Sequence, residues 1–457
     1  MIPRMACVAG LIWILWTIPT RGATVYKCDG SQSDCQNKVN GASDGDTVVV
    51  PAGSFRWTGP IFLSGKAITF QGQGIGSTII TGAAGKQVFF NQVTTQAKAS
   101  FRITGMTLKT TGTSGLQINA SGGPSNAGLY GFRIDHIEFQ GNAGIFIGGI
   151  IWGLIDHCTF EGDADMVTIY AYNEADFPLG PNGEGATSYS LPLNLGTKEA
   201  VYVEDCTFTE TTGALAVNDM QYGARMVFRH NTASTTYIQT HSARGSNRGG
   251  GLKWEIYNNT WNGNGLAFRG IMMLSGTGVI FNNTISGYTD SSTGTIWFGD
   301  QRATQQLVLG EYWACIGANP APAGSPPGPY AWDGNIESTG WPCLDQIGRG
   351  PGTRGNEPTI PVYLWNNGTT PTCATGGACN NSTGLALNFA PPQPSLGPFI
   401  KTTAHSNGDK DYCIGTTMPA SCGNHTNTYT PFTYPHPLQS AGAQGPASPT
   451  NLTVVVH

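Results

Sequence analysis

Six segments of the chain superimpose without gaps, and apolar residues recur in the same columns of all six. They are IDHIEF (134–139), IDHCTF (155–160), VEDCTF (203–208), FRHNTA (228–233), IYNNTW (256–261) and IFNNTI (280–285). Their starts are separated by 21, 48, 25, 28 and 24 residues. Such a period suits one coil of a β-solenoid built from short strands, and the longest step holds a coil plus a loop insertion near 171–199.

Two columns of this repeat are apolar, so we expect them to face the core. The first column holds Ile134, Ile155, Val203, Phe228, Ile256 and Ile280, and the sixth holds Phe139, Phe160, Phe208, Ala233, Trp261 and Ile285. The fourth column holds Ile137, Cys158, Cys206, Asn231, Asn259 and Asn283. Stacked asparagines can bond to one another along the axis and satisfy buried turn amides. Cys158 and Cys206 are either a disulfide or two buried thiols, and we favour thiols because side chains on stacked strands point in parallel.

A second strand follows these segments, with period-2 alternation. Examples are LQIN (116–119), IFIG (145–148), VTIY (167–170), LAVN (215–218), LAFR (266–269) and IWFG (296–299). We expect the first and third residues of each to face the core and the second and fourth to face outward. This is the pattern of a sheet that is covered on one face only.

Composition agrees with many short strands and tight turns, because charged residues are only 11% of the chain and it holds 64 Gly and 28 Pro. Residues 1–23 are predicted to be a signal peptide, with Arg4 before a short apolar run and small residues at the end. The alternative of a retained membrane anchor is disfavoured because the run is short.

Cysteine usage fits an exported chain. Of 11 cysteines, Cys7 leaves with the predicted signal. Eight of the other ten form pairs that are near in sequence, which we expect to be disulfides. These pairs are Cys28 and Cys35, Cys315 and Cys343, Cys373 and Cys379, and Cys413 and Cys422.

The net charge of −5 becomes −7 when the two arginines of the signal, Arg4 and Arg21, are removed. That sign excludes nucleic acid as a partner, whereas a local basic patch can still bind an anionic glycan. We therefore expect a monomer without a membrane span in the mature chain. Its location would be extracellular, periplasmic or on the cell surface.

The N-terminal part carries SDGDTVVVPAGSFRW (43–57) and then ITFQGQG (68–74). Here the chain resembles the pectate-lyase-like superfamily (the pectin lyase fold). The resemblance implies an all-β, right-handed parallel β-helix over 24–300, opened by a short capping helix at 33–40. We expect 301–440 to be an irregular, Pro/Gly/Cys-rich, disulfide-tied cover. Residues 441–457 are either a tail or the start of a missing β-sandwich module.

Candidate chemistry gathers on the outward side of the second strand. With the alternation above, Tyr170, Asn218, His241 and Arg269 should stack on one exposed face. Others are close in sequence to that line: Asp219, Arg244, Arg248, Asp300, Arg302 and an exposed Trp297. The set suits an extended acidic polysaccharide that is cleaved by β-elimination. Arg244 and Arg269 would neutralise the uronate carboxylate, and His241 or Tyr170 would move the proton.

A calcium ion is the cofactor that the sequence suggests. The segment IDHCTFEGDAD (155–165) resembles the WIDHC-type strand of family 1 pectate lyases, in which an acidic residue contributes to calcium binding. Asp156, Asp163 and Asp165 offer the oxygen ligands that Ca²⁺ requires.

Two other functions stay open. A glycoside hydrolase would need two carboxylates, such as Asp219 with Asp163, Asp165 or Asp300. The Asn-Thr-Asp, Asp-Asp and Gly-His-Gly segments of polygalacturonase-like β-helices are absent. A non-catalytic glycan-binding or adhesion solenoid is the alternative outside enzymes.

Overall fold

The protein was analysed as a computed structural model. It describes residues 22–93, 101–110, 115–120, 129–141, 144–149, 151–162, 167–170, 188, 191–210, 216–221, 223–240, 251–289, 295–298, 347–351, 358–369, 379–380, 385–388 and 408–441. Of the predicted signal peptide (1–23), only residues 22 and 23 are described, and the C-terminal residues 442–457 lie outside the described residues.

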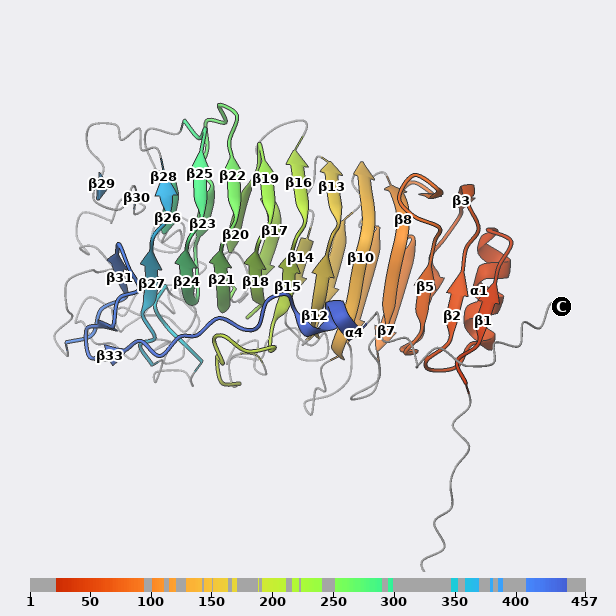
Figure 1. Ribbon diagram of the computed structural model, residues 1–457, viewed down its shortest axis with the longest axis horizontal. Coiled ribbons are helices and arrows are strands. Elements are labelled where there is room, and N and C mark those ends of the chain that lie inside the picture. The colour runs from red at the N-terminus through yellow and green to blue at the C-terminus, as the bar shows by residue number, and fades with distance from the viewer. Residues whose placement is uncertain are drawn as a thin grey trace, which may run out of the picture.

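The described chain is a parallel β-helix whose coils stack along one long axis (Figure 1). Each coil contributes a strand to face 1, turns a corner into face 2, and then crosses to face 3. Faces 1 and 2 share one 20-stranded sheet, and face 3 is an 11-stranded sheet. The parallel β-helix expected from the repeat is therefore confirmed.

The strands have the following bounds. Face 1 contains β1 (Val25–Lys27), β2 (Thr47–Val49), β5 (Thr69–Gln71), β12 (Ile151–Asp156), β15 (Val201–Glu204), β18 (Arg225–Arg229), β21 (Lys253–Tyr257), β24 (Thr277–Phe281), β27 (Val362–Trp365) and β31 (Tyr412–Gly415). Face 2 contains β3 (Gly53–Trp57), β6 (Thr78–Gly82), β13 (Thr159–Gly162), β16 (Thr207–Glu210), β19 (Thr232–Ser234), β22 (Thr260–Asn262), β25 (Thr284–Ser286) and β28 (Gly368–Thr369). The longer β8 (Arg102–Thr110) and β10 (Leu129–Gly141) continue around the corner through both faces.

Face 3 contains β4 (Ile61–Phe62), β7 (Phe89–Val93), β9 (Leu116–Ala120), β11 (Ile145–Gly148), β14 (Val167–Tyr170), β17 (Ala216–Gln221), β20 (Tyr237–Thr240), β23 (Ile271–Met273), β26 (Ile296–Phe298), β29 (Cys379–Asn380) and β30 (Leu385–Asn388). All pairings in faces 1 to 3 are parallel except that of β29 with β30. The strands β27, β28, β30 and β31 show that the sheets continue past residue 300.

The corner between faces 1 and 2 explains the polar half of the repeat. One residue per coil there adopts a left-handed backbone, with φ near +50° to +75°. These residues are Gly105, His136, His157, Asp205, His230, Asn258, Asn282 and Asn366. Asn, Asp and His tolerate that conformation better than other side chains, apart from glycine. The left-handed turn therefore accounts for the His, Asp and Asn residues of this column.

The predicted asparagine ladder is confirmed. Asn231, Asn259 and Asn283 are buried, and the Oδ1 atom of each accepts from the backbone N–H of the preceding coil. Asn367 extends the ladder by one more coil, since its Oδ1 accepts from the Asn283 backbone N–H at 3.2 Å. The ladder thus gives each buried corner amide a partner, which an apolar side chain could not do.

Cys158 and Cys206 occupy the same column as buried free thiols, as favoured above. The Cys158 backbone N–H points at the Cys206 sulfur, 3.4 Å away. Burial raises the pKa of the Cys206 thiol well above its ordinary value, so it stays protonated. These two coils therefore replace the asparagine amides by the weaker hydrogen bonds of sulfur.

Apolar columns fill the interior, as the pattern predicted. Ile134, Ile155 and Val203 are paired across successive strands and fully buried. In the sixth column the rings of Phe139, Phe160 and Phe208 stack with centroids 4.6 and 4.7 Å apart. Burying each such side chain contributes roughly 1.5–3 kcal/mol, so these stacks hold the coils together.

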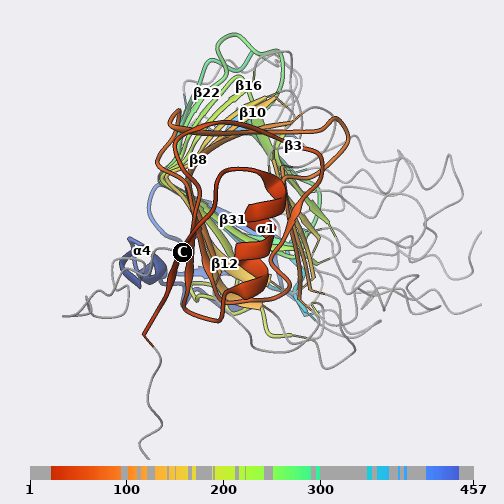
Figure 2. The same cartoon turned by 90° about the vertical axis from the view of Figure 1, so that its right-hand side faces the viewer.

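The two ends of the solenoid are covered differently. The helix α1 (Gln32–Gly41) lies across the N-terminal end (Figure 2), begins after the capping side chain of Ser31, and is tied by the disulfide Cys28–Cys35. This is the capping helix that the resemblance implied. At the other end the disulfide Cys413–Cys422 joins β31 to the small hairpin of β32 (Ser421–Cys422) and β33 (His425–Thr426). The expected pairs Cys315–Cys343 and Cys373–Cys379 include residues outside the described ranges.

After β33 the chain reverses and runs back along the outside of face 1 (Figure 1). We call residues 427–441 the return segment; it ends in α4 (Pro437–Ala441), which lies beside β12. Buried charges on face 1 hold it. The Arg229 guanidinium donates to the carbonyls of Phe432 and Thr433 at 2.7 and 2.8 Å and pairs with Glu204 at 2.6 Å. An extended segment is thereby fixed by its backbone carbonyls.

Candidate functional site

The candidate site lies on the outer side of face 3. Strand pairing places one outward column across four consecutive strands, and it contains Asp219, Gln239, Met272 and Trp297. The residues that alternate with them face the core, including the fully buried Met220, Thr240 and Met273. Stacked strands are about 4.8 Å apart, so the column brings an acid, an amide and an aromatic ring onto one surface.

Asp219, predicted only to lie close to the outward line, occupies an outward position of β17. Its carboxylate is largely buried and accepts a hydrogen bond of 2.6 Å from the Gln221 side-chain amide. Gln239 lies beside it on the next strand and is also buried. The Gln221 amide therefore orients the carboxylate.

Arg269 lies on this surface, although LAFR (266–269) is not the strand that we predicted. The strand of this coil is β23, which begins two residues later at Ile271. The Arg269 guanidinium lies 4.0 Å from the Trp297 ring centroid and 4.8 Å from that of Phe268. One guanidinium nitrogen also contacts the Met272 sulfur at 3.1 Å. The cation is thus fixed over an aromatic platform, where the low dielectric strengthens its field.

Trp297 is not the exposed ring that we expected. It is only 5% exposed and belongs to an apolar cluster with Ala216, Tyr237, Met272 and Leu274. An outward side chain on a strand is normally exposed to solvent, but neighbouring side chains cover Trp297. Trp297 supports Arg269 and does not itself present a surface to a sugar.

The prediction that Asn218 points outward beside Tyr170 is wrong. Strand β17 is shifted in register, so that Asn218 pairs with Val167 and Gln221 pairs with Tyr170. Asn218 is consequently buried, and its amide bonds to the backbone N–H and C=O of Gln239, both at 3.2 Å. The register also shifts between Ala216 and Asn218, where the pairing with β20 is irregular.

Several predicted site residues lie outside the described residues, and their roles stay predictions. They are His241, Arg244, Arg248, Asp300 and Arg302, together with Asp163 and Asp165. For Tyr170 the backbone is described, as the last residue of β14. The described strand β20 ends at Thr240, directly before His241 in the chain, and β26 ends at Phe298, two residues before Asp300.

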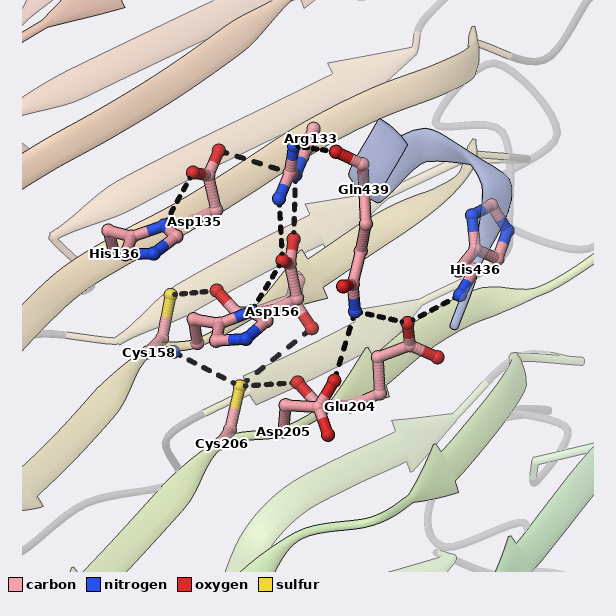
Figure 3. A network of polar contacts seen from close by, with 12 residues as sticks. Arg133, Asp135, His136, Asp156, Cys158, Glu204, Asp205, Cys206, His436 and Gln439 are labelled. Atoms are coloured by element: carbon pink, nitrogen blue, oxygen red, sulfur yellow. Dashed lines mark hydrogen bonds and ion pairs between the residues drawn. The ribbon is translucent and has the colours of Figure 1, made fainter. Parts of the chain in front are cut away.

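Asp156 does not fit the predicted calcium site. It is fully buried, and its two carboxylate oxygens accept from the Arg133 guanidinium at 2.9 and 2.8 Å (Figure 3). The Nδ1 atom of His157 lies 2.8 Å from the same carboxylate. Both oxygens are already engaged by cationic or N–H donors, which a calcium ion would have to displace. Within the described ranges no group of three or more His, Cys, Asp or Glu side chains is arranged to hold a metal.

The described end of the loop insertion near 171–199, residues 191–200, packs against face 1. Arg225 donates to the backbone carbonyls of Ser188 and Pro192 at 2.7 and 2.6 Å, and Lys253 donates to that of Asn194 at 2.6 Å. Burial lowers the pKa of Lys253, which the nearby Glu255 partly offsets. Two buried cations therefore anchor the returning end of this loop.

Sequence reasoning missed the polar network on face 1. It includes Asp135, Asp156 and Glu204 (Figure 3), and strand pairing puts Arg229 in the same outward column on the next strand. The signal was present as the dipeptide Asp-His, which recurs 21 residues apart at Asp135-His136 and Asp156-His157. The residues of the return segment that contact this network have no comparable repeat in the sequence.

Among the described residues no helix combines the length and the apolar character that a membrane span needs. Neither a family model nor a curated protein matches this chain. Among solved structures, it is similar to a PL6 family polysaccharide lyase from Pseudopedobacter saltans, with 13% identity and a TM-score of 0.39 over 86% of this chain and 92% of that one. The strand pairings make this chain a parallel β-helix protein, the fold that its resemblance to the pectate-lyase-like superfamily implied.

Proposed function

We propose that this protein is an exported polysaccharide lyase that cleaves a uronate-containing polymer by β-elimination on the outer side of face 3. The observation that carries the proposal is the Arg269 guanidinium, held 4.0 Å over the Trp297 ring on the surface that also bears Asp219. A guanidinium is planar and suits a carboxylate group, which it can bind through two parallel hydrogen bonds. A row of coils offers such sites along an extended substrate.

Elimination requires three steps at one glycosidic bond. A cation neutralises the uronate carboxylate and so acidifies the neighbouring C–H bond, which is the role proposed for Arg269 together with Arg244. A base removes that proton, and the electron pair forms a carbon–carbon double bond while the glycosidic C–O bond breaks. His241 or Tyr170 is the proposed base, and the leaving oxygen takes a proton. No water is consumed.

Export is part of the proposal. It is supported by the disulfides Cys28–Cys35 and Cys413–Cys422, since such bonds persist in oxidising compartments. Calcium is not assigned a step, because Asp156 is committed to Arg133. The proposed partner is an extended acidic polysaccharide, bound by a monomer.

The test is an ultraviolet assay of the purified mature protein on pectate, alginate, glucuronan and glycosaminoglycans, with and without calcium. We expect a rise in the absorbance of the unsaturated uronate ends on one of these polymers. Arg269→Met should slow that reaction by about 100-fold or more, the usual effect of losing one electrostatic stabiliser. The control Arg56→Met removes an exposed arginine on face 2 and should leave the rate unchanged.

Three results would overturn the proposal. A flat trace on all polymers excludes a lyase of these substrates. New reducing ends without absorbance indicate a hydrolase, for which Asp219 would be the first carboxylate to replace. Binding without either signal indicates a glycan-binding solenoid. An unchanged rate in Arg269→Met would reject Arg269 as the carboxylate-binding group.

A further inference from the structure

Two consecutive coils place a histidine at the same corner between faces 1 and 2. His136 and His157 both adopt the left-handed backbone, with φ of 53° and 51°. Their rings are stacked, with centroids 5.1 Å apart and an angle of 1° between the planes. Both side chains are about half exposed, at 54% and 43%. The pair therefore presents two parallel imidazoles to solvent.

A buried carboxylate fixes each ring, and Figure 3 shows the pair of Asp135 and His136. The Nδ1 atom of His136 lies 2.8 Å from the Asp135 carboxylate, and that of His157 lies 2.8 Å from the Asp156 carboxylate. Asp135 also accepts two hydrogen bonds of 2.6 Å from Arg102. The two oxygens of Asp156 accept from the Arg133 guanidinium at 2.9 and 2.8 Å. Each carboxylate is thus paired with a guanidinium.

The carboxylates decide the tautomer of both histidines. A carboxylate paired with a guanidinium accepts hydrogen bonds, so each Nδ1 must donate. A neutral imidazole then carries its free lone pair on Nε2. No hydrogen bond from any described residue reaches either Nε2 atom. Two lone-pair nitrogens therefore face solvent from adjacent coils.

We propose that His136 and His157 form a two-histidine site for one divalent late first-row metal ion, such as Cu²⁺, Ni²⁺ or Zn²⁺, with water in the remaining positions. Imidazole nitrogen suits these ions. An imidazole that ligates a metal almost always donates its other N–H to a carboxylate or carbonyl, and Asp135 and Asp156 already supply that support. The site differs from a calcium site in offering nitrogen and not oxygen ligands.

Metal binding requires the two rings to tilt toward each other. Parallel rings point their lone pairs in the same direction and so bind in neighbouring positions of the metal, where metal–nitrogen bonds of about 2.0–2.1 Å bring the two nitrogens to about 3 Å of each other, so the rings must approach by about 2 Å at their tips. Half-exposed rings that pivot at Cβ have room for this. Asp205 follows in the same corner column, but its oxygens already accept from Tyr434 and Gln439. It is therefore left out of the ligand set.

The turn itself does not require histidine. Later coils place Asn258, Asn282 and Asn366 at the same corner with the same left-handed backbone. A third histidine in the column, His230, is engaged differently: its ring stacks on Tyr434 with centroids 3.6 Å apart, and its Nε2 contacts the Asn258 amide at 3.2 Å. His230 thus provides a matched control, and asparagine is the replacement that the fold already uses.

The experiment is a titration of the tag-free protein with copper(II) chloride at neutral pH, followed by electron paramagnetic resonance. We expect one ion whose spectrum carries two equatorial imidazole nitrogens, and that zinc chloride displaces it. Loss of a supporting carboxylate alone usually costs about 10–100-fold in affinity, so His136→Asn or His157→Asn should weaken binding by at least about tenfold. His230→Asn should bind copper like the unmodified protein.

The double variant His136→Asn/His157→Asn should lose the two-imidazole signal while keeping the circular dichroism spectrum of the unmodified protein. Retention of that signal in the double variant would overturn the proposal. So would a spectrum of the unmodified protein with fewer than two imidazoles, which needs no variant to fold. The site lies on faces 1 and 2, so its failure would leave the proposed lyase activity of face 3 untouched.

Discussion

Replacing Asn259 by alanine tests how much the buried ladder contributes to stability. The Asn259 side chain makes four hydrogen bonds inside the corner. Its Oδ1 accepts from the backbone and side-chain nitrogens of Asn231 at 2.9 and 3.2 Å, and its Nδ2 donates to Phe228 O and Asn283 Oδ1, both at 2.9 Å. Each bond contributes about 1 kcal/mol net, and its former partners stay buried. The expected loss is about 4 kcal/mol.

The assay is unfolding in guanidinium chloride, followed by the fluorescence of the buried Trp254 and Trp261 on adjacent strands of these coils. The matched control is Thr260→Ala, because Thr260 is the next residue and is exposed. An exposed position of this kind should change stability by less than about 0.5 kcal/mol. If Asn259→Ala costs no more than the control, the ladder does not hold the coils together and this reasoning is refuted.

Three further predictions concern the network on face 1 and the cysteines. Arg229→Met leaves the buried Glu204 without its cation, so we expect a loss of about 3–5 kcal/mol and rapid proteolytic release of the return segment. Burial, and then the charges of two arginines, lower the pKa of His436 to about 4, whereas the unfolded chain binds this proton near pH 6.5. Its contribution to stability is therefore lost as the pH falls from about 6.5 to 4, and from pH 7 to pH 4.5 the free energy of unfolding should fall by about 2–3 kcal/mol more in the unmodified protein than in His436→Asn. Mass spectrometry after alkylation without reductant should find Cys158 and Cys206 labelled only once the protein is unfolded, and labelling of the folded protein would contradict their burial.

The columns of the repeat could be predicted because they depend on local geometry. Ile134 and Ile155 face the core because the first column of every coil points inward. A residue such as His136 or Asn258 recurs at each corner because the backbone there is left-handed. Because inward and outward residues alternate in a fixed order, the sequence determines which residues of faces 1 and 2 point into the core. Sequence alone therefore gives the fold, the ladder and the capping helix.

The site on face 3 could be predicted only in part, because loops of unequal length separate faces 2 and 3. Arg269 was predicted to face outward and lies over Trp297, whereas Asp219 was predicted only to lie near that line. Asn218 was assigned the wrong side, since β17 is shifted against β14. The segment that carries Arg269 reads as an alternating strand, whereas β23 begins at Ile271. Periodicity cannot choose among registers when an insertion precedes a strand.

Contacts between distant parts of the chain had no sequence signal at all. Arg133 bonds to the carbonyl of Gln439, and Arg229 bonds to those of Phe432 and Thr433, although more than 200 residues separate the partners. Backbone carbonyls are present in every residue, so their choice of partner cannot be read from side-chain identity.

The most direct test of the proposed function is to digest the acidic polymer in oxygen-18 water and to weigh the products by mass spectrometry. Elimination breaks the glycosidic bond without adding water, so we predict oligomers that are unsaturated at one end and free of solvent oxygen. Products that each gain one oxygen-18 atom and carry no double bond would show that the bond is hydrolysed, and would contradict the account.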